Sequence, residues 1–376
     1  MSLLRIILRF FFAKKSWKKP KHSKFLVLDS VGSLDISNIL GFVDTIAIRG
    51  ESYNIYILMK LVLNRRFWSK KYVDLYCDEY IKTTKPEWLI TFIDNNLYVY
   101  NVKNRFPWIK VAVIQNGNRD DWLSKIKSKD HWKVDYFFCF NDAIGKYYSQ
   151  HIQIKSIPIG SLRSNNIPII KMPKNKDTVL FVSQFEIKSL SKDYYINSQG
   201  QHFNYLQFYR SEQILLKIIK KWCLLNKNEL LILGRSKPQS RSEYNFFHSI
   251  LGDDGWHFLD KNEIANSYLQ VDMAGIVVSI DSTLGYEAIS RGNKTAFFCN
   301  RSKQMNSVDR SFGWPIVFPQ NGRFWSNSCS EDKIYSVMNY LNNVSDFEWQ
   351  KQVMSLSKKL MSYDSGNSII KSIMSR

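Results

Sequence analysis

The sequence predicts an α/β protein built from two Rossmann-like domains that face a central cleft. Short apolar runs alternate with longer amphipathic segments along most of the 376 residues, which is typical of parallel sheets with helical crossovers. The runs fall into two sets, separated by a stretch rich in Asn, Pro and Lys at residues 161–177. Hydrophobic residues make up 44% of the chain, enough to build buried cores and to argue against disorder.

Ten apolar runs are the predicted strands. The first set covers residues 24–28, 45–48, 88–93, 110–114 and 136–140, and the second covers residues 178–182, 230–233, 255–258, 275–280 and 294–298. The segments between them, such as residues 205–225, have the spacing of apolar residues that predicts amphipathic helices. In sheets of this kind a ligand binds beyond the carboxyl ends of the strands.

The runs and the linker together predict the domain boundaries. We expect an N-terminal Rossmann-like domain over residues 25–165 and a C-terminal one over residues 175–330. Residues 331–376 are expected to form helices that pack back across both domains.

The first 24 residues form a separate basic segment with eight Lys or Arg and no acidic residue. Its apolar residues come first, but no small-residue cleavage site follows, so a secretory signal does not fit. We expect an amphipathic segment that associates with an acidic membrane surface; the alternative is a frayed basic terminus. No apolar run approaches the ~18 residues needed to span a bilayer.

Charge and cysteine content indicate the compartment and exclude one class of partner. The net charge is +20, but Lys outnumbers Arg and no nucleic-acid-binding motif occurs, so we expect no nucleic acid partner. The five cysteines are scattered without a Cys-x-x-Cys pair, which suits a reducing cytoplasm. We therefore expect a cytoplasmic protein, peripheral on the inner face of the cytoplasmic membrane.

Several motifs of common enzymes are missing from the chain. It has no Gly-x-x-x-x-Gly-Lys-Ser/Thr loop and no Gly-x-Gly-x-x-Gly fingerprint, and none of its six His has metal-ligand spacing to another. Kinase, dehydrogenase and zinc-protease functions lose support, and we expect no cofactor and no bound metal.

The strongest candidate site follows the predicted strand at residues 275–280. Asp281, Ser282 and Thr283 form the turn, and their hydroxyl groups and the backbone N–H groups of the next helix suit a phosphate. Gly285 lets the backbone approach a ligand, and Glu287 is one turn inside the helix, where its carboxylate can bind ribose hydroxyls. The alternative is simple capping with a solvated Glu.

Two other strand ends in the second domain add candidates for the donor site. Gly234, Arg235 and Ser236 follow one strand, and the Arg235 guanidinium suits a phosphate. Ser183 and Gln184 follow another and can donate hydrogen bonds to a ligand. For both sets an ordinary surface turn is the alternative.

The first domain supplies the candidate catalytic and acceptor-binding residues. Asp94 ends a mostly apolar run, where a nucleophile or general base belongs, although it can equally cap a helix. Asn95, Asn116, Arg119 and Ser161 follow strands of the same domain and are candidates for binding an acceptor; turn formation is their alternative role.

These motifs together resemble a bacterial family of O-antigen and surface-carbohydrate biosynthesis proteins. The matching stretches are TFIDNN (residues 91–96), IQNGNR (114–119), IGS (159–161), LFVSQF (180–185), LGRS (233–236), IDSTLGYEAISRG (280–292) and FGWP (312–315). The resemblance implies a GT-B glycosyltransferase with the donor nucleotide on the second domain, the acceptor on the first and no essential metal. The Ser282-Thr283 pair is similar to the phosphate site of bacterial enzymes that transfer Kdo-like sugars from CMP donors.

The resemblance thus implies transfer of a sugar from a nucleotide-sugar donor to a lipid-linked glycan acceptor in O-antigen or lipopolysaccharide biosynthesis. Two alternatives remain open at this level. One is another enzyme of the same architecture, either a sugar-nucleotide epimerase or a polyol-phosphate transferase. The other is a carbohydrate-binding assembly protein without enzymatic activity.

Overall fold

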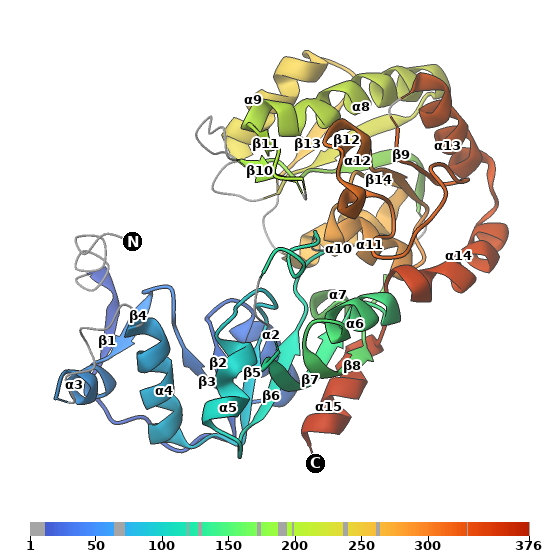
Figure 1. The fold of residues 1–376 in the computed structure, drawn as a ribbon. Helices are drawn as coiled ribbons and strands as arrows, with labels where there is room; N and C mark the ends of the chain where they lie inside the picture. Colours follow the sequence, from blue (N-terminus) through green and yellow to red (C-terminus); the bar gives the residue numbers. More distant parts are fainter. Residues whose placement is uncertain are drawn as a thin grey trace. The chain divides into compact units, whose positions relative to one another are not determined.

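The computed structural model describes the chain in two compact units (Figure 1). The described residues are 12–63, 72–118, 120–126, 130–170, 174–186, 194–197, 199–235, 240–260, 264–328 and 330–375. Unit 1 comprises Met1–Asn116, Ser128–Asn166 and Asp364–Arg376, and unit 2 comprises Gly117–Lys127 and Ile167–Tyr363. The C-terminal helices are therefore divided between the units at residue 363.

Unit 1 is built on a six-stranded sheet in the order β3-β2-β5-β6-β7-β8, and every neighbouring pair is parallel. The strands are β2 (Phe25–Leu28), β3 (Asp44–Ile46), β5 (Trp88–Thr91), β6 (Lys110–Ile114), β7 (Lys133–Cys139) and β8 (Gln153–Pro158). Strands β2 and β5 are buried along their whole length, which explains why they read as continuous apolar runs.

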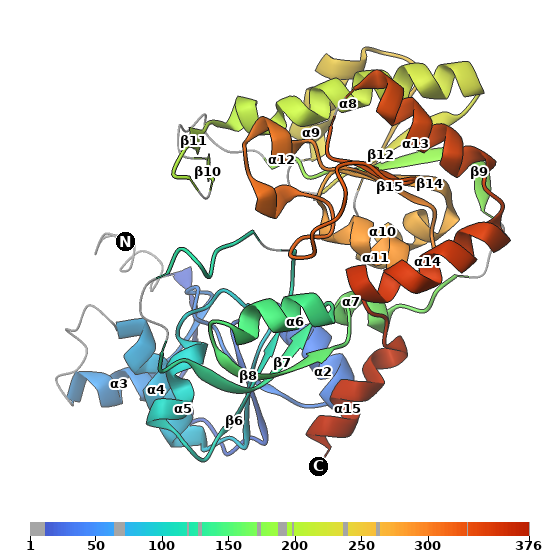
Figure 2. The same ribbon diagram turned by 45° about the vertical axis from the view of Figure 1, so that its right-hand side comes forward.

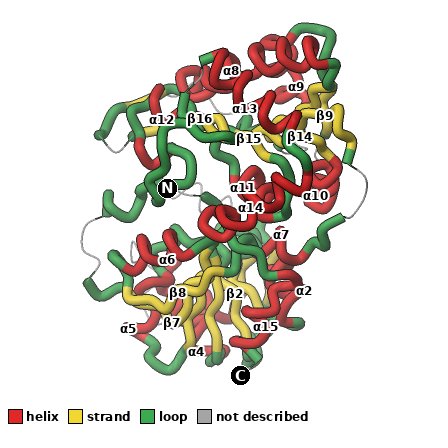
Figure 3. Tube along the Cα trace, turned by 90° about the vertical axis from the view of Figure 1, so that its right-hand side faces the viewer, coloured by secondary structure: helices red, strands yellow, loops and turns green. Residues whose placement is uncertain are grey.

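Helices cover both faces of this sheet (Figure 3). They are α2 (Ser33–Leu40), α3 (Ile55–Leu63), α4 (Tyr72–Thr84), η1 (Val99–Asn101), α5 (Val102–Arg105), α6 (Asp142–Ser149), α7 (Leu162–Asn166), η4 (Ser365–Asn367) and α15 (Ser368–Met374). Helices α2, α7 and α15 lie on one face and α4, α5 and α6 on the other.

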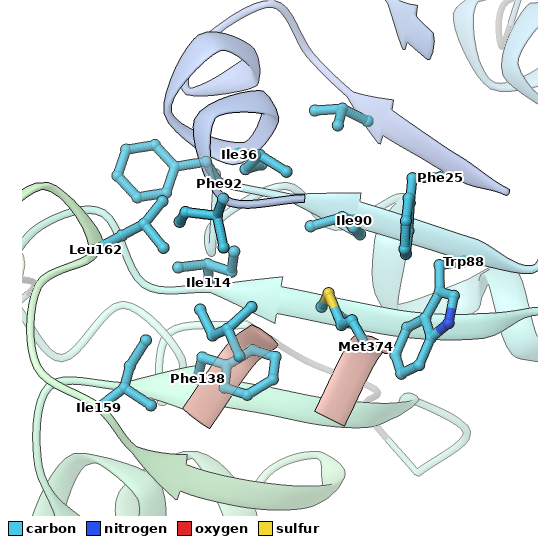
Figure 4. Close-up of a cluster of buried hydrophobic side chains, with 14 residues drawn as sticks. Phe25, Ile36, Trp88, Ile90, Phe92, Ile114, Phe138, Ile159, Leu162 and Met374 are labelled. Atoms are coloured by element: carbon cyan, nitrogen blue, oxygen red, sulfur yellow. The ribbon is translucent and has the colours of Figure 1, made fainter. Parts of the chain in front are cut away.

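The core of unit 1 joins strand β2 to the last helix of the chain (Figure 4). Ile90, Ile114 and Phe138 project from three neighbouring strands, and Ile36 of α2 and Met374 of α15 pack against them. All five side chains are at most 1% exposed. The end of the chain is thus part of the first unit's core.

The N-terminal basic segment is described from residue 12 onward, and part of it is a strand. Strand β1 (Lys14–Ser16) pairs in parallel with β4 (Ser52–Asn54). The Asn54 side chain donates a hydrogen bond to the Lys18 carbonyl at 2.9 Å. The side chains of Lys14 and Lys15 stay exposed, so the segment is attached to unit 1 through its backbone while its charges face solvent.

Unit 2 is built on a second six-stranded parallel sheet, in the order β13-β12-β9-β14-β15-β16. Its strands are β9 (Asn175–Val182), β12 (Glu229–Leu233), β13 (His257–Leu259), β14 (Ala274–Ser279), β15 (Thr295–Phe298) and β16 (Trp325–Ser326). A small antiparallel pair, β10 (Tyr195–Ile196) and β11 (His202–Phe203), precedes the longest helix.

Helices also cover both faces of the second sheet (Figure 2). They are α8 (Tyr205–Asn226), α9 (Ser240–Leu251), α10 (Ile264–Met273), α11 (Thr283–Ser290), α12 (Arg301–Gln304), η3 (Val308–Arg310), α13 (Glu331–Asn343) and α14 (Asp346–Leu360). Helices α8, α9 and α13 lie on one face, and α10, α11 and α14 on the other.

The predicted fold class is confirmed, since both sheets are parallel with helices on each face. All ten predicted apolar runs overlap strands of the two sheets. The sequence missed β8 and β16. In the described part of the chain, no helix combines the length and the apolar character that crossing a membrane requires.

Candidate functional site

A cavity of about 340 Å³ lies in unit 2, where strands β9, β12 and β14 end. Its lining residues are Asn118, Val182, Ser183, Gln184, Tyr194, Phe208, Tyr209, Leu233, Gly234, Arg235, Ser267, Asp281, Ser282, Thr283, Leu284, Arg301 and Arg310. Three arginines and one aspartate are the charged residues among them. The cavity therefore favours an anionic ligand.

The N-terminus of α11 forms one side of this cavity. Ser282 caps the helix, and its hydroxyl accepts a hydrogen bond from the Leu284 N–H at 3.3 Å. The Thr283 hydroxyl accepts one from the Asn118 N–H at 2.9 Å. Because the start of a helix carries partial positive charge, these two hydroxyl groups stand where an anion is stabilised.

Gly285 has a packing role that the sequence did not suggest. A Cβ atom at this position would lie 2.4 Å from the Cβ of Ser279, on the neighbouring strand β14. Gly285 therefore allows α11 to pack closely on the sheet, and it is not among the residues that line the cavity. The predicted close approach of its backbone to a ligand stays a prediction.

A buried carboxylate holds the turns that follow β9 and β12. Glu243 of α9 accepts a hydrogen bond from the Ser183 hydroxyl, and both of its carboxylate oxygens lie 3.0 Å from the Arg235 backbone nitrogen. A Cβ on Gly234 would lie 2.8 Å from the Phe258 ring. These contacts fix the positions of Ser183 and Gly234 at the cavity wall.

The Arg235 side chain lies at the rim of the cavity. Its Nη1 atom donates to the Gln184 carbonyl at 3.1 Å and lies 3.1 Å from Glu186 Oε2. The side chain is 46% exposed, so it can reorient toward an anion that enters. Ser236 was predicted beside it and lies outside the described residues.

Two further arginines converge on Asp281 from different elements. Arg301 of α12 lies 2.8 Å from one Asp281 oxygen, and Arg310 lies 3.2 Å from the other. Arg301 also pairs with Glu212 at 2.9 Å and donates to the Gln184 side chain at 2.7 Å. Its guanidinium lies 4.1 Å from the centre of the Phe208 ring.

This network shifts the pKa of two carboxyl groups in opposite directions. Burial raises the pKa of Glu212 to about 7, although Arg301 acts against the shift. Burial also favours the neutral form of Asp281, but Arg301 and Arg310 outweigh it and lower the pKa of Asp281 below its ordinary value. Asp281 is thus the charged partner that holds both guanidinium groups at the cavity.

Glu287 is on the same helix as the phosphate-binding candidates but does not line the cavity. Glu287 is 6% exposed and therefore buried. Its predicted contact with ribose stays a prediction.

Asp94, the candidate catalytic residue, is in unit 1 and is fully buried. The Tyr148 hydroxyl donates to its carboxylate at 2.7 Å, and the Tyr100 hydroxyl donates to its backbone carbonyl. In this arrangement the carboxylate contacts protein groups, so its catalytic role stays a prediction.

The predicted acceptor-binding residues also belong to unit 1, apart from one. Asn95 is exposed and Asn116 half-buried, while Ser161 is buried and its hydroxyl accepts from the Ser164 N–H at 3.4 Å. Arg119 lies outside the described residues, and its neighbour Asn118 lines the cavity of unit 2. Acceptor binding by these residues stays a prediction.

Sequence reasoning missed two arginines that line the cavity and two buried carboxylates that contact its lining residues. Arg301 comes just after the buried strand β15, so the rule that found Ser282 and Arg235 would also have found it. Arg310, Glu212 and Glu243 follow no strand, and no signal in the sequence points to them. Within the described residues, no group of three or more His, Cys, Asp or Glu side chains is arranged to hold a metal ion.

Comparisons with known proteins agree with this architecture. No curated protein matches the chain. Among solved structures, the chain is similar to the UDP complex of Staphylococcus aureus MnaA, with a TM-score of 0.54, 10% identity, and coverage of 93% of this chain and 95% of that one. A UDP-N-acetylglucosamine 2-epimerase gives a TM-score of 0.52 at 11% identity and 95% coverage of both chains. The wall teichoic acid polymerase TagF gives 0.50 at 10% identity, with 95% and 90% coverage.

These neighbours have the GT-B fold, and at such low identity the likeness concerns the fold alone. The family comparison goes further, because a family described as "putative O-antigen biosynthesis protein" matches residues 112–376. That match spans more than half of the chain and includes the whole cavity of unit 2. The chain therefore belongs to this O-antigen biosynthesis family and has the GT-B fold.

Proposed function

We propose that this protein is a GT-B glycosyltransferase that transfers a sugar from a nucleotide-sugar donor to a lipid-linked glycan acceptor during O-antigen biosynthesis. The observation that carries the proposal is the convergence of the α11 N-terminus with three arginines in one cavity. Such a cavity matches the phosphate groups of a nucleotide sugar, which carry the negative charge of that ligand.

In this proposal the residues of unit 2 bind the donor. Ser282 and Thr283 donate hydrogen bonds to the phosphate, since a hydroxyl that now accepts from the backbone can still donate its own proton. Arg235 reorients from Glu186 toward the phosphate and offsets the charge that develops on the leaving group. Arg301 and Arg310, held by Asp281, keep the cavity positive.

The residues of unit 1 have the acceptor and chemical roles in this proposal. Asp94 acts as the base that activates the acceptor hydroxyl, or as a nucleophile, and this requires that its contact with Tyr148 opens. Asn95, Asn116 and Ser161 bind the acceptor, together with Arg119. The exposed lysines of the N-terminal segment attract an acidic membrane that carries the lipid-linked acceptor.

The titles of the solved neighbours suggest which nucleotides to test first. One of them is titled as a complex with UDP and another as a complex with CDPG, so pyrimidine nucleotides are the first ligands to test. A CMP-linked Kdo-like sugar is the donor that the Ser282-Thr283 pair suggests.

The test is a binding screen followed by a product assay. The protein is titrated with CMP, CDP, UDP, GDP and dTDP, and we expect one nucleotide to raise the melting temperature. The matching nucleotide sugar is then incubated with and without a membrane extract that contains lipid-linked glycan. A sugar that appears on the lipid only when the extract is present supports the proposal.

The other outcomes identify the alternatives. A nucleotide sugar that changes without any acceptor indicates an epimerase, and transfer of a polyol phosphate indicates a teichoic-acid-type polymerase. Glycan binding without any nucleotide binding indicates a carbohydrate-binding assembly protein. Each of these outcomes overturns the proposed glycosyltransferase.

A further inference from the structure

Ser267 is a buried cavity residue whose hydroxyl group lacks a partner. It is the fourth residue of α10 and is 3% exposed. Within the described part of the chain, its hydroxyl oxygen has no hydrogen-bond partner. The same residue lines the cavity of unit 2. A buried hydroxyl without a partner costs folding free energy, so its position needs a reason.

A helical serine ordinarily has a partner close at hand, namely the backbone carbonyl three or four residues before it. Other helical serines of unit 2 use it: Ser211 bonds to the Phe208 carbonyl at 3.1 Å, Ser249 to Phe246 at 2.7 Å, Ser290 to Glu287 at 2.8 Å and Ser355 to Gln352 at 3.0 Å. The Ser267 hydroxyl makes no such bond, although the residue lines the cavity.

The part of the cavity next to Ser267 is apolar. Val271 lies one turn further along the same face of α10 and belongs to a hydrophobic cluster with Val182 and Leu233. Leu284 packs against this cluster. Val182, Leu233 and Leu284 all line the cavity, so the lone hydroxyl adjoins an apolar wall. The polar lining residues include the three arginines, Asp281, Gln184 and the Ser282-Thr283 pair.

We propose that Ser267 is a specificity-determining residue that hydrogen-bonds the heterocyclic base of the bound nucleotide. The inference rests on the proposed nucleotide-binding function of this cavity. A base combines an apolar face, which suits the wall of Val182, Leu233 and Leu284, with a polar edge that suits a single hydroxyl. A phosphate lacks the apolar face and belongs with the arginines.

The test is the variant Ser267→Ala, studied by calorimetric titration and thermal unfolding. Without nucleotide, we expect its melting temperature to equal or exceed that of the wild type, because the change removes an unsatisfied buried group. We expect its affinity for the best-binding nucleotide to fall about tenfold. Its affinity for ribose 5-phosphate and for pyrophosphate, which lack a base, is expected to stay the same.

Two further variants serve as controls. Ser249→Ala removes a helical hydroxyl that is already bonded to Phe246 and lies outside the cavity, so it should leave nucleotide affinity unchanged. Ser267→Thr keeps the hydroxyl group and should retain more of the affinity than Ser267→Ala.

The outcomes separate this inference from the proposed function. If the wild type binds none of the nucleotides, the proposed function fails. If the wild type binds one and Ser267→Ala binds it equally well, the inference alone is overturned. An equal loss for ribose 5-phosphate also overturns it, because the hydroxyl would then contact the sugar or the phosphate.

Discussion

Arg301 Nη1 lies 2.8 Å from Asp281 Oδ1, and neither side chain is more than 6% exposed. The pair joins the start of α12 to the turn before α11, so it links a buried charge to the candidate phosphate site. Glu212 on α8 contacts the same guanidinium, and Arg310 contacts the same aspartate. Removing one member leaves others without partners, which makes the network testable.

The α11 hydroxyl groups are the first target. Replacing Ser282 and Thr283 together by Ala should weaken nucleotide binding about tenfold or more, since each charge-assisted hydrogen bond contributes ~1.5–3 kcal/mol. Calorimetric titration measures the change. Ser290→Ala is the control, because that hydroxyl is on the same helix and bonds the Glu287 carbonyl away from the cavity. Unchanged affinity in the double variant, with the fold intact, would falsify the assignment of the phosphate site.

Arg301 should be important for stability as well as for binding. Arg301→Gln leaves the buried carboxylates Glu212 and Asp281 without one cationic partner, and breaking a buried pair in this way costs ~3–5 kcal/mol. Urea unfolding measures the loss. Lys221→Gln is the comparison, because its pair with Glu331 is exposed and its removal should leave the unfolding midpoint nearly unchanged. Similar midpoints for the two variants would contradict the prediction.

Glu212 should make stability depend on pH in a defined window. Its pKa rises from an ordinary 4.5 to about 7 in the folded protein, so between these values the folded state holds a proton that the unfolded state has lost. Stability contributed by this group is therefore present below pH 4.5 and declines as the pH rises toward 7. Glu212→Gln should flatten this part of the stability profile, as measured by unfolding at several pH values. If stability changes with pH equally steeply in the wild type and in Glu212→Gln, the raised pKa of Glu212 is contradicted.

Asp281 should change the dependence of folding stability on pH in the opposite direction. Its pKa is lowered, since the effect of Arg301 and Arg310 exceeds that of burial, so its contribution to stability is present above pH 3.8 and is lost as the pH falls below it. In Asp281→Asn this acid-side loss should disappear, while overall stability falls because two arginines lose their carboxylate. Acid unfolding curves of the wild type and of Asp281→Asn measure this difference. Parallel curves would contradict the prediction that the two arginines lower the pKa of Asp281.

Asp94→Asn tests the catalytic assignment. The amide oxygen can still accept the Tyr148 hydrogen bond, so we expect the melting temperature and the nucleotide affinity to stay the same. A base or nucleophile has no substitute in Asn, and turnover should fall by at least ~10². Tyr148→Phe shows what loss of the hydrogen bond alone does. Near-normal turnover in Asp94→Asn would return the residue to a structural role.

The membrane proposal is best tested by charge reversal. Deleting residues 1–24 would also remove β1 and its pairing with β4, so Lys14, Lys15, Lys18 and Lys19 are replaced by Glu instead. All four side chains are exposed, and the melting temperature should stay the same. Sedimentation with acidic vesicles should decrease in the variant, and in the wild type it should decrease as salt is added. Salt-insensitive binding would rule out an electrostatic attraction between the basic segment and the membrane.

The sequence by itself determined the fold class and most of the sheet strands. Parallel strands covered by helices on both faces must be apolar along their length, as in Phe25–Leu28 and Ala274–Ser279, and such runs stand out without any structure. The edge strand β8 contains only half-buried and exposed residues, and β16 has only two residues, so neither gives that signal. The Ser282-Thr283 turn was predictable because a strand end and a helix start are adjacent in the chain.

Tertiary structure alone decided which charges surround the cavity and which glycine serves packing. Arg310, Glu212 and Glu243 are on different elements, and they contact partners between 8 and 89 residues away in the chain. The packing role of Gly285 became visible only from its distance to Ser279, which shows a helix packed on a strand. Local patterns specify strands and helix caps because those depend on neighbours in the chain. A buried charge is specified by partners that only folding brings within 3 Å.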